Sequence, residues 1–293
     1  MCDTQQQNEP ERGTRQGAFG LSGVVAPIGY GCVMSNNGEA RDTALVQSVD
    51  RAVAVLELLA RNGEAGITEI AAELGVHKSS ASRLVHTLQA RDLVEQDGER
   101  GPFRIGLGML RFAGAVTGQL DYVRVGGPVC TELADRLGET VNIAILDSGV
   151  ALNVSQARGS SAVAAQNWVG QRTPLHATSS GKVLLAAASA DDQDRLLAGD
   201  LEPCAPRTIT DPVKLRCVLQ RTAEDGFATC MEELEAGLHA VAVPVFGSHG
   251  DVVAAISAAG PAYRLSQKRM PEIVEELRVA SRDLSVRMGH SVL

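Results

Sequence analysis

The 293-residue chain has no long apolar run, no paired cysteines and no excess of positive charge. A helix that spans a bilayer needs about 18 or more apolar residues, and no stretch comes near that length, so we expect no membrane partner. The formal net charge of -8 excludes a surface that is basic all over, so any contact with nucleic acid must come from a local patch. The composition is that of a globular protein, for which we expect a cytoplasmic location.

The six cysteines are scattered, form no C-x-x-C pair and have no histidine at ligand spacing beside them. This pattern argues against a structural zinc site and against a disulfide framework. We therefore expect no metal ion and no cofactor.

Residues 1–44 show no sustained periodicity. The run from Ala18 to Val33 is apolar but broken by glycine and proline, and it resembles an export or lipoprotein signal only weakly. The sequence favours a disordered tail, or an upstream extension of a chain whose translation starts at Met34.

Two helices are predicted after this tail. The first spans "SVDRAVAVLELLARNG", with Ser48 as N-cap and Gly63 as the stop, and the second spans "TEIAAELG", with Thr68 as cap and Gly75 at its end. The residues expected to face inward are Val49, Ala52, Val53, Leu56 and Leu59 in the first helix and Ile70, Ala71 and Leu74 in the second.

A third helix is predicted from about Lys78 to Ala90, and a hairpin follows it. Two short extended runs, Leu93 to Glu95 and Phe103 to Ile105, are separated by glycine-containing turns. Three helices and a closing hairpin predict a winged helix-turn-helix over residues 45–106. The residues that the third helix is expected to bury are Ala81, Leu84, Val85 and Leu88.

The first turn of the third helix carries small and polar side chains, as a helix that enters the major groove of DNA requires. No acidic residue occurs from His77 to Arg91, although the module around it is slightly acidic. Ser79 could also cap this helix. The alternative is a surface helix whose serines are simply solvated. The residues expected to contact double-stranded operator DNA are His77, Lys78, Ser79, Ser80, Ser82 and Arg83 in the helix and Arg100 and Arg104 in the hairpin.

Residues 107–120 read as a linker helix, and another helix is predicted from Gly127 to Gly138. Beyond them, extended apolar runs such as "TVNIAILD", "GVALNVSQ", "HAVAVPVF" and "VVAAISAAG" alternate with helical segments. This alternation predicts an α/β domain on a mainly antiparallel sheet over residues 121–293.

The segment "TPLHATSSGKVLLA" has three interpretations. A phosphate-binding P-loop fails because His176 and Val183 stand where the motif needs glycine and a hydroxyl residue. A nucleophile elbow fails because Ala177 replaces the required glycine. A loop entering a helix remains, either merely capped or able to bind a carboxylate through free amides. Those amides belong to Ser179, Ser180 and Gly181.

No residue is expected to be catalytic. Glu232, Glu233 and Glu235 lack a histidine partner, so they favour a structural turn over a catalytic or metal cluster. His176 is interpreted as a side chain that shapes its loop, and Trp168 as a packing residue or a pocket wall.

The chain resembles the IclR family of bacterial transcriptional regulators from Ser48 to about Gly289. The resemblance rests on "SVDRAVAVLELLA", "LGVHKSSASRLVHTLQARDLV", "LGETVNIAILD", "VGQRTPLHATSSGKVLLA", "PRTITDP", "DGFATCMEELEAGLHAVAVPV" and "AAISAAGP" in this order. It implies a winged helix-turn-helix, a linker helix and a C-terminal effector domain of GAF-like fold. It also implies homodimers, often paired into tetramers, and small organic acids as effectors.

The resemblance also implies which residues contact the effector. Cys230 stands where some members carry an acid, and Ala240 and Ala259 replace larger or polar groups. We therefore expect a roomy pocket for a bulky carboxylate, such as an aromatic acid. The implied contact residues are Ala162, Ala165, Ser179, Ser180, Cys230, Leu238, Ala240, Ser257 and Ala259.

Together these features predict a regulator whose operator affinity is controlled by a small carboxylate effector. The alternative is an enzyme that acts on a small organic acid and carries a fused helix-turn-helix. That alternative lacks a recognisable nucleophile and base or a metal triad in the sequence.

Overall fold

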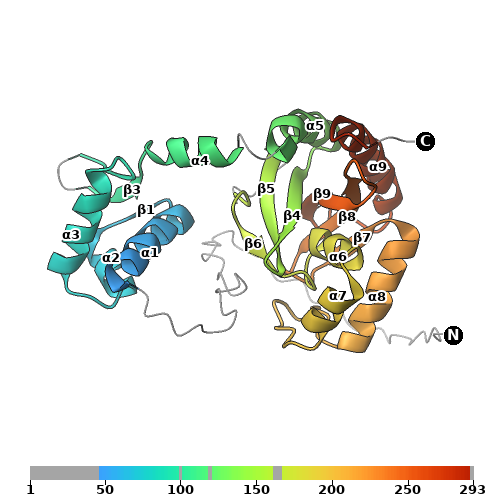
Figure 1. Ribbon diagram of the computed structural model, residues 1–293, viewed down its shortest axis with the longest axis horizontal. Helices are drawn as coiled ribbons and strands as arrows, with labels where there is room; N and C mark the ends of the chain where they lie inside the picture. Colours follow the sequence, from blue (N-terminus) through green and yellow to red (C-terminus); the bar gives the residue numbers. More distant parts are fainter. Residues whose placement is uncertain (1–45, 99–100, 118–120, 161–166, 291–293) are drawn as a thin grey trace, which may run out of the picture. The chain divides into compact units, whose positions relative to one another are not determined.

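The computed structural model describes residues 46–98, 101–117, 121–160 and 167–290. Within these ranges, none of the helices is long and apolar enough to cross a membrane. Residues 46–117 and 121–290 are described separately below (Figure 1).

The N-terminal region is a helix-turn-helix with a small sheet. Its strands follow the order β1-β3-β2, and both strand pairs are antiparallel. The hairpin is where the sequence predicts it, and the two-residue β1 adds a strand that the sequence does not predict. The elements are α1 Gln47–Asn62, β1 Glu64–Ala65, α2 Ile67–Glu73, α3 Lys78–Gln89, β2 Val94–Gln96, β3 Phe103–Ile105 and α4 Met109–Thr117.

The starts of the first three helices differ from the predicted caps. Helix α1 begins one residue before Ser48, and α3 begins one residue before Ser79, so both serines lie inside helices. The N-cap of α2 is Gly66, whose N–H donates to the Glu69 carboxylate at 2.8 Å, and Thr68 lies inside the helix. The carboxylate at the third helical position thus satisfies the N–H of the cap residue, and no side-chain hydroxyl caps this helix. Gly63 ends α1 at a φ of +80°, as predicted.

Helix α1 has two apolar stripes. Val55, Leu58 and Leu59 are its buried residues, whereas Val49 and Val53, predicted to face inward, are 59% and 48% exposed. The prediction of the buried face was therefore wrong in part, because residues on both stripes recur at helical spacing. The buried core of this region consists of Val55, Leu58, Leu59, Ala65, Ile70, Ala71, Ala81, Val85, Leu88, Val94 and Phe103.

The C-terminal region is an α/β domain on a six-stranded sheet. The strand order is β6-β5-β4-β9-β8-β7 and every pair is antiparallel, which confirms the predicted fold class. The elements are α5 Asp121–Leu137, β4 Thr140–Asp147, β5 Val150–Arg158, β6 Arg172–Thr173, α6 Ser179–Ala186, α7 Ala190–Leu197, α8 Pro212–Asp225, β7 Ala228–Met231, β8 Leu238–Phe246, β9 Val252–Pro261 and α9 Met270–Arg287.

Helix α5 begins at Asp121, six residues before the predicted start at Gly127, and it continues through Pro128. Gly126 fits there because the helix approaches β4 closely: an added Cβ would lie 2.3 Å from Cδ1 of Ile143. The close approach of helix and strand explains Gly126, the residue directly before the predicted boundary at Gly127.

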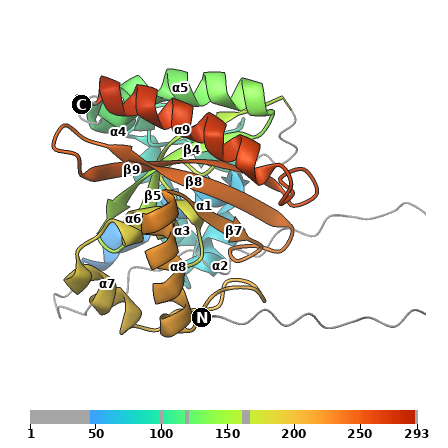
Figure 2. The same ribbon diagram turned by 90° about the vertical axis from the view of Figure 1, so that its right-hand side faces the viewer.

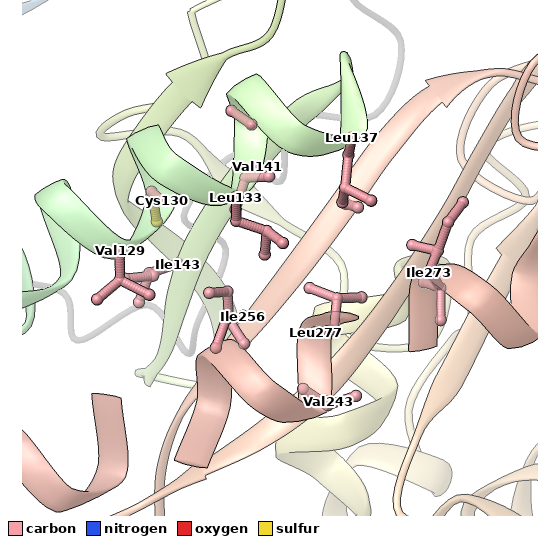
Figure 3. Packing of buried hydrophobic residues seen from close by; sticks show 14 of the residues in the cluster. Val129, Cys130, Leu133, Leu137, Val141, Ile143, Val243, Ile256, Ile273 and Leu277 are labelled. Atoms are coloured by element: carbon pink, nitrogen blue, oxygen red, sulfur yellow. The ribbon is translucent and has the colours of Figure 1, made fainter. Parts of the chain in front are cut away.

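Helices cover both faces of the sheet. Helices α5 and α9 lie on one face, and α6, α7 and α8 lie on the other (Figure 2). Large aliphatic side chains such as Leu133, Ile143, Ile256 and Leu277 interlock between α5, α9 and the strands (Figure 3). On the α6 face the strands contribute alanines to the core, and the larger apolar side chains come mainly from the helices.

Strand β8 runs on past the short β7, and α9 completes its edge. Ser281 Oγ donates to the carbonyl oxygen of Pro244, and the N–H of Phe246 donates to Ser285 Oγ at 2.9 Å. Pro244 itself has no N–H to satisfy. The Pro244 carbonyl and the Phe246 N–H on this part of the edge are therefore bonded within the domain.

Candidate DNA-binding helix and effector site

Helix α3 has one buried face and one solvent face. Ala81, Val85 and Leu88 are buried, and Leu84, which was predicted to be buried, is only partly so. The solvent face carries most of the predicted DNA contacts: Ser82 is partly buried, whereas His77, Lys78, Ser79, Ser80 and Arg83 are exposed. The helix therefore presents a first turn of hydroxyls and two cations, the pattern that contacts phosphates and base edges.

Arg104 in the hairpin is already paired. Its Nε donates to Oε1 of Glu95 on the neighbouring strand at 2.6 Å, and this hydrogen bond raises the pKa of the Arg104 guanidinium. The sequence could not reveal the pair, because it depends on the strand register. Any DNA phosphate that Arg104 contacts would therefore also lie near the negative charge of Glu95. Arg100, the other predicted hairpin contact, lies outside the described residues.

The start of α6 is built around Thr178. Its Oγ1 donates to the carbonyl oxygen of Pro174 at 3.0 Å and accepts from the N–H of Gly181 at 3.1 Å. The amide of Gly181 is therefore not free, which corrects the prediction for that residue. In the part of the chain that the structure describes, the amides of Ser179 and Ser180 have no hydrogen-bond partner. Two amides with the positive end of a helix dipole can receive a carboxylate.

Five of the predicted effector residues lie on neighbouring strands of the sheet. Cys230 on β7 pairs with Ala240 on β8, which pairs with Ala259 on β9, so their side chains form one cross-strand row. Ser257, two residues along β9, lies in the next row on the same face. Leu238 is at the start of β8, two residues before Ala240. Ala162 and Ala165 lie outside the described residues.

Cys230 joins this row to the loop before α6. Its Sγ donates to the carbonyl oxygen of Ala177 at 3.1 Å, and burial raises the pKa of the thiol. The thiol is therefore neutral at physiological pH. The row has small, uncharged side chains where it meets the loop.

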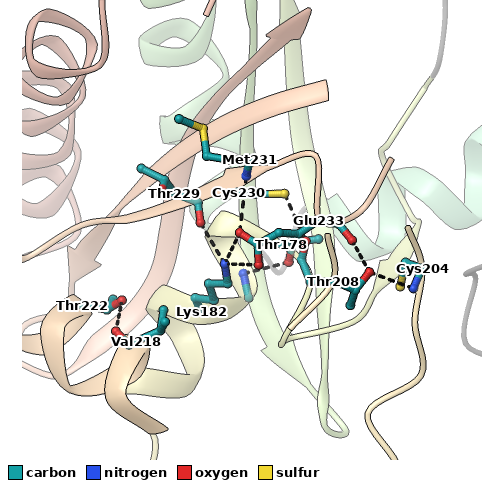
Figure 4. A network of polar contacts seen from close by, with 12 residues as sticks. Thr178, Lys182, Cys204, Thr208, Val218, Thr222, Thr229, Cys230, Met231 and Glu233 are labelled. Carbon is teal, nitrogen blue, oxygen red and sulfur yellow. Dashed lines mark hydrogen bonds and ion pairs between the residues drawn. The ribbon is translucent and has the colours of Figure 1, made fainter. Parts of the chain in front are cut away.

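A buried ion pair that the sequence does not predict joins α6 to the loop after β7 (Figure 4). Lys182 is 1% exposed, and its Nζ donates to Glu233 Oε1 at 2.6 Å and to the carbonyl oxygen of Thr229 at 2.9 Å. The Glu233 backbone carbonyl accepts from Thr208 Oγ1 at 2.6 Å. This network fastens α6 to β7 and to the loop after it. The lysine charge is balanced by the Glu233 carboxylate, so it is not available to a ligand.

The remaining polar residues that the sequence singles out serve the loops. His176 is buried and its Nε2–H donates to the carbonyl oxygen of Glu202 at 2.9 Å, while burial lowers the pKa of the imidazole. Glu232 Oε1 accepts from the N–H of Gly237 at 3.0 Å, as a structural turn requires. Trp168 is partly buried.

Two family models match the chain. The model described as "IclR helix-turn-helix domain" matches residues 48–98, and the model described as "Bacterial transcriptional regulator IclR C-terminal" matches residues 114–286. The matches cover the helix-turn-helix with strands β1 and β2, and the whole C-terminal sheet with its helices apart from the last residue of α9.

Curated proteins and solved structures resemble the chain along most of its length. It is 34% identical over 256 residues to the HTH-type transcriptional repressor AllR of Salmonella typhi, which covers 86% of this chain and 94% of that protein. It is 32% identical to the HTH-type transcriptional regulator XynR of Escherichia coli, over 84% of this chain and 98% of that protein. A crystal structure of an IclR homologue from Microbacterium hydrocarbonoxydans, complexed with 4-hydroxybenzoate, has a TM-score of 0.70 and 28% identity, and covers 82% of this chain and 98% of its own.

Proposed function

Because the chain belongs to the IclR family of bacterial transcriptional regulators, we propose that a small carboxylate bound at the start of α6 controls its affinity for operator DNA. The chain is a DNA-binding transcriptional regulator and not an enzyme, since both domains and the named relatives are those of regulators. The alternative of an enzyme with a fused helix-turn-helix is therefore wrong.

The proposal for the effector rests on one observation. The two unpartnered amides of Ser179 and Ser180 follow directly on the loop that Cys230 contacts, and Cys230 forms a row with Ala240 and Ala259. The amides supply partial positive charge for a carboxylate, and the small side chains leave room for the rest of the molecule. A homologue solved with 4-hydroxybenzoate, an aromatic acid, supports this chemical class.

The effector experiment measures the affinity of the full chain for its own upstream DNA by fluorescence anisotropy while acids are titrated. We expect aromatic acids to change the affinity and two- or three-carbon keto acids to have little effect. Tight calorimetric binding of glyoxylate or pyruvate with no binding of aromatic acids would contradict the proposal.

We propose further that Lys78 and Arg83 on α3 hold the operator. The double variant Lys78→Ala, Arg83→Ala removes two exposed cations from a face that has no acid nearby in the sequence. We expect it to lose footprinting protection of the upstream region. Arg195→Ala with Arg216→Ala removes the same charge from exposed positions on α7 and α8 and should retain protection. Unchanged binding by the first pair would refute the assignment.

The single variant Arg83→Ala separates two kinds of contact. A uniform loss on all DNA sequences identifies a phosphate contact, and a loss confined to the operator identifies a base contact.

A homodimer is the assembly that the exposed apolar residues favour. Val46, Val49 and Val53 recur at helical spacing along and just before α1, and all are at least 48% exposed. Leu107 and Leu110, just before and within α4, are 74% and 67% exposed. Exposed apolar stripes of this kind mark protein–protein contacts.

Val49→Asp is expected to weaken dimerisation in sedimentation experiments. Val279→Asp, at an exposed valine on α9, is the matched control. A sedimentation coefficient that neither change alters would count against the α1 surface.

A further inference from the structure

A buried amide on β4 has an unpartnered oxygen. Asn142 is 5% exposed, and its Oδ1 is, among the residues that the structure describes, the one buried side-chain nitrogen or oxygen without a hydrogen-bond partner. Buried polar atoms in native proteins are almost always paired, and an exception calls for a physical reason. The fold alone leaves this acceptor incomplete.

The strand register places Asn142 beside the proposed effector site. Residues that pair across antiparallel strands point to the same face, and Asn142 pairs with Ser257 on β9. Two residues earlier, Thr140 pairs with Ala259, which belongs to the row of Cys230 and Ala240.

Ala144 settles which face this is. It lies two residues after Asn142 on β4 and packs in the same buried cluster as Val183 and Leu184 of α6. Asn142 therefore lies on the sheet face that α6 covers. The side chain of Asn142 adjoins the site from β4, and the unpartnered backbone N–H groups of Ser179 and Ser180 adjoin it from α6.

A second buried asparagine in the same sheet shows what a structural role looks like. Asn153 on β5 is 7% exposed, and its Nδ2 donates to the carbonyl oxygen of Gln171 at 3.3 Å. Its amide helps to hold the segment before β6. Asn142 is equally buried and accepts nothing through Oδ1.

We propose that Asn142 is a further specificity-determining contact of the effector site, and that its Oδ1 accepts a hydrogen bond from a hydroxyl group of the effector. This inference rests on the proposed function, in which a carboxylate binds at α6. The effector is then a hydroxy-carboxylate. A hydroxyl fits because it can donate to the amide oxygen, whereas a second carboxylate offers only acceptors and would leave Oδ1 unsatisfied.

The test uses matched acids on the full chain. Isothermal titration calorimetry compares benzoate with 3- and 4-hydroxybenzoate, and propanoate with lactate. We expect the hydroxylated member of at least one pair to bind about tenfold more tightly, which corresponds to ~1.4 kcal/mol. In Asn142→Leu, which keeps the branched shape of the side chain and removes its polar atoms, this preference should disappear while the affinity for the unhydroxylated member remains.

Two outcomes would overturn the inference: equal affinity within every pair in the unmodified protein, or an unchanged preference in Asn142→Leu. Failure of the proposed function looks different, because then none of the acids binds at all, and the inference falls with it.

A ligand-free measurement separates ligand recognition from a structural role. We expect Asn142→Leu not to lower the melting temperature, because it removes an acceptor that the fold leaves unpaired. The matched variant Asn153→Leu should lower the melting temperature and retain the hydroxyl preference. If Asn142→Leu does not fold, Asn142→Ser, which shortens the side chain, is expected to lose the preference too. A lowered melting temperature with an intact preference in either Asn142 variant would make the residue structural.

Discussion

The two faces of the C-terminal sheet come from the same strands but are built in different ways. On the face toward α5 and α9, the strands contribute valines and isoleucines that pack against leucines of the helices. On the face toward α6 and α8, the strands contribute Ala144, Ala242 and Ala255, and Asn142 and Ser257 lie among them. The first face is closed by apolar packing. The second is held by the Lys182–Glu233 pair and has small side chains next to the start of a helix.

One sheet can therefore serve stability on one face and recognition on the other. Large aliphatic side chains exclude water and fix the strands, and they leave no volume for a ligand. Alanine, serine and asparagine on alternate positions occupy less space and offer polar groups. Because side chains alternate along a strand, both properties fit into the same strands β4, β8 and β9, on alternate residues.

The largest effect is expected from breaking the buried pair on the α6 face. Glu233→Ala leaves Lys182 buried without a counter-charge, which costs about 3–5 kcal/mol in typical proteins. The free energy of unfolding in urea, followed by circular dichroism, measures the loss. The double variant Lys182→Met, Glu233→Leu should recover most of it, since no unpaired charge remains. A single variant as stable as the original would mean that the pair does not fasten α6.

A comparable loss is expected on the opposite face from a cavity. Leu277 is fully buried in α9, and Leu277→Ala should cost about 2–5 kcal/mol in the same urea experiment. The control Leu277→Met keeps the volume and should cost less than about 1.5 kcal/mol. Effector binding should survive in both, because the change is on the face away from α6.

A matched pair of enlargements tests whether the α6 face has spare room. Ala258 and Ala240 lie on neighbouring strands and face opposite sides of the sheet. Ala258→Val should cost about 1–3 kcal/mol through overpacking. Ala240→Val should cost less and should weaken effector binding in calorimetry. Equal destabilisation by the two changes would argue against space beside Ala240.

The smallest expected effect concerns pH and the loop before α6. Burial lowers the pKa of His176, so the unfolded chain takes up a proton at a higher pH than the folded chain does. Stability contributed by the neutral imidazole is complete above the unfolded pKa of about 6.5 and decreases as the pH falls below it. Urea unfolding between pH 5 and 7 should show this decrease, and His176→Gln should flatten it. An identical slope in the variant would remove His176 as its cause.

The regular elements could be predicted from the sequence because their patterns are local. The run "TVNIAILD" is β4 without a shift in either end, and the segments for β5, β8 and β9 are off by one or two residues. The sequence does not predict the two-residue strands β1 and β6 or the polar helix α7, because none of them carries an apolar period. The start of α5 was misplaced because glycine and proline look like a boundary when the partner strand is unknown.

Contacts between distant segments could not be predicted. Lys182 and Glu233 are 51 residues apart, and the one hint is a lysine within the otherwise apolar "GKVLLA". The cap at Gly181 could have been recognised, because Thr178 stands three residues before it, the spacing of a side-chain cap. The row from Cys230 to Ala259 required the strand order, which no single-sequence pattern fixes. The orphan oxygen of Asn142 appears only when every neighbour is in place.

The completed edge of β8 restricts how copies of this chain can join. An open strand edge is a template on which another chain can add a strand, and such additions lead to open-ended aggregates. Ser281 and Ser285 bind the Pro244 carbonyl and the Phe246 N–H, so these two groups are not available to an incoming strand. Replacing both serines with alanine would leave the Pro244 carbonyl and the Phe246 N–H without partners beneath α9, and α9 would then hold this edge less firmly.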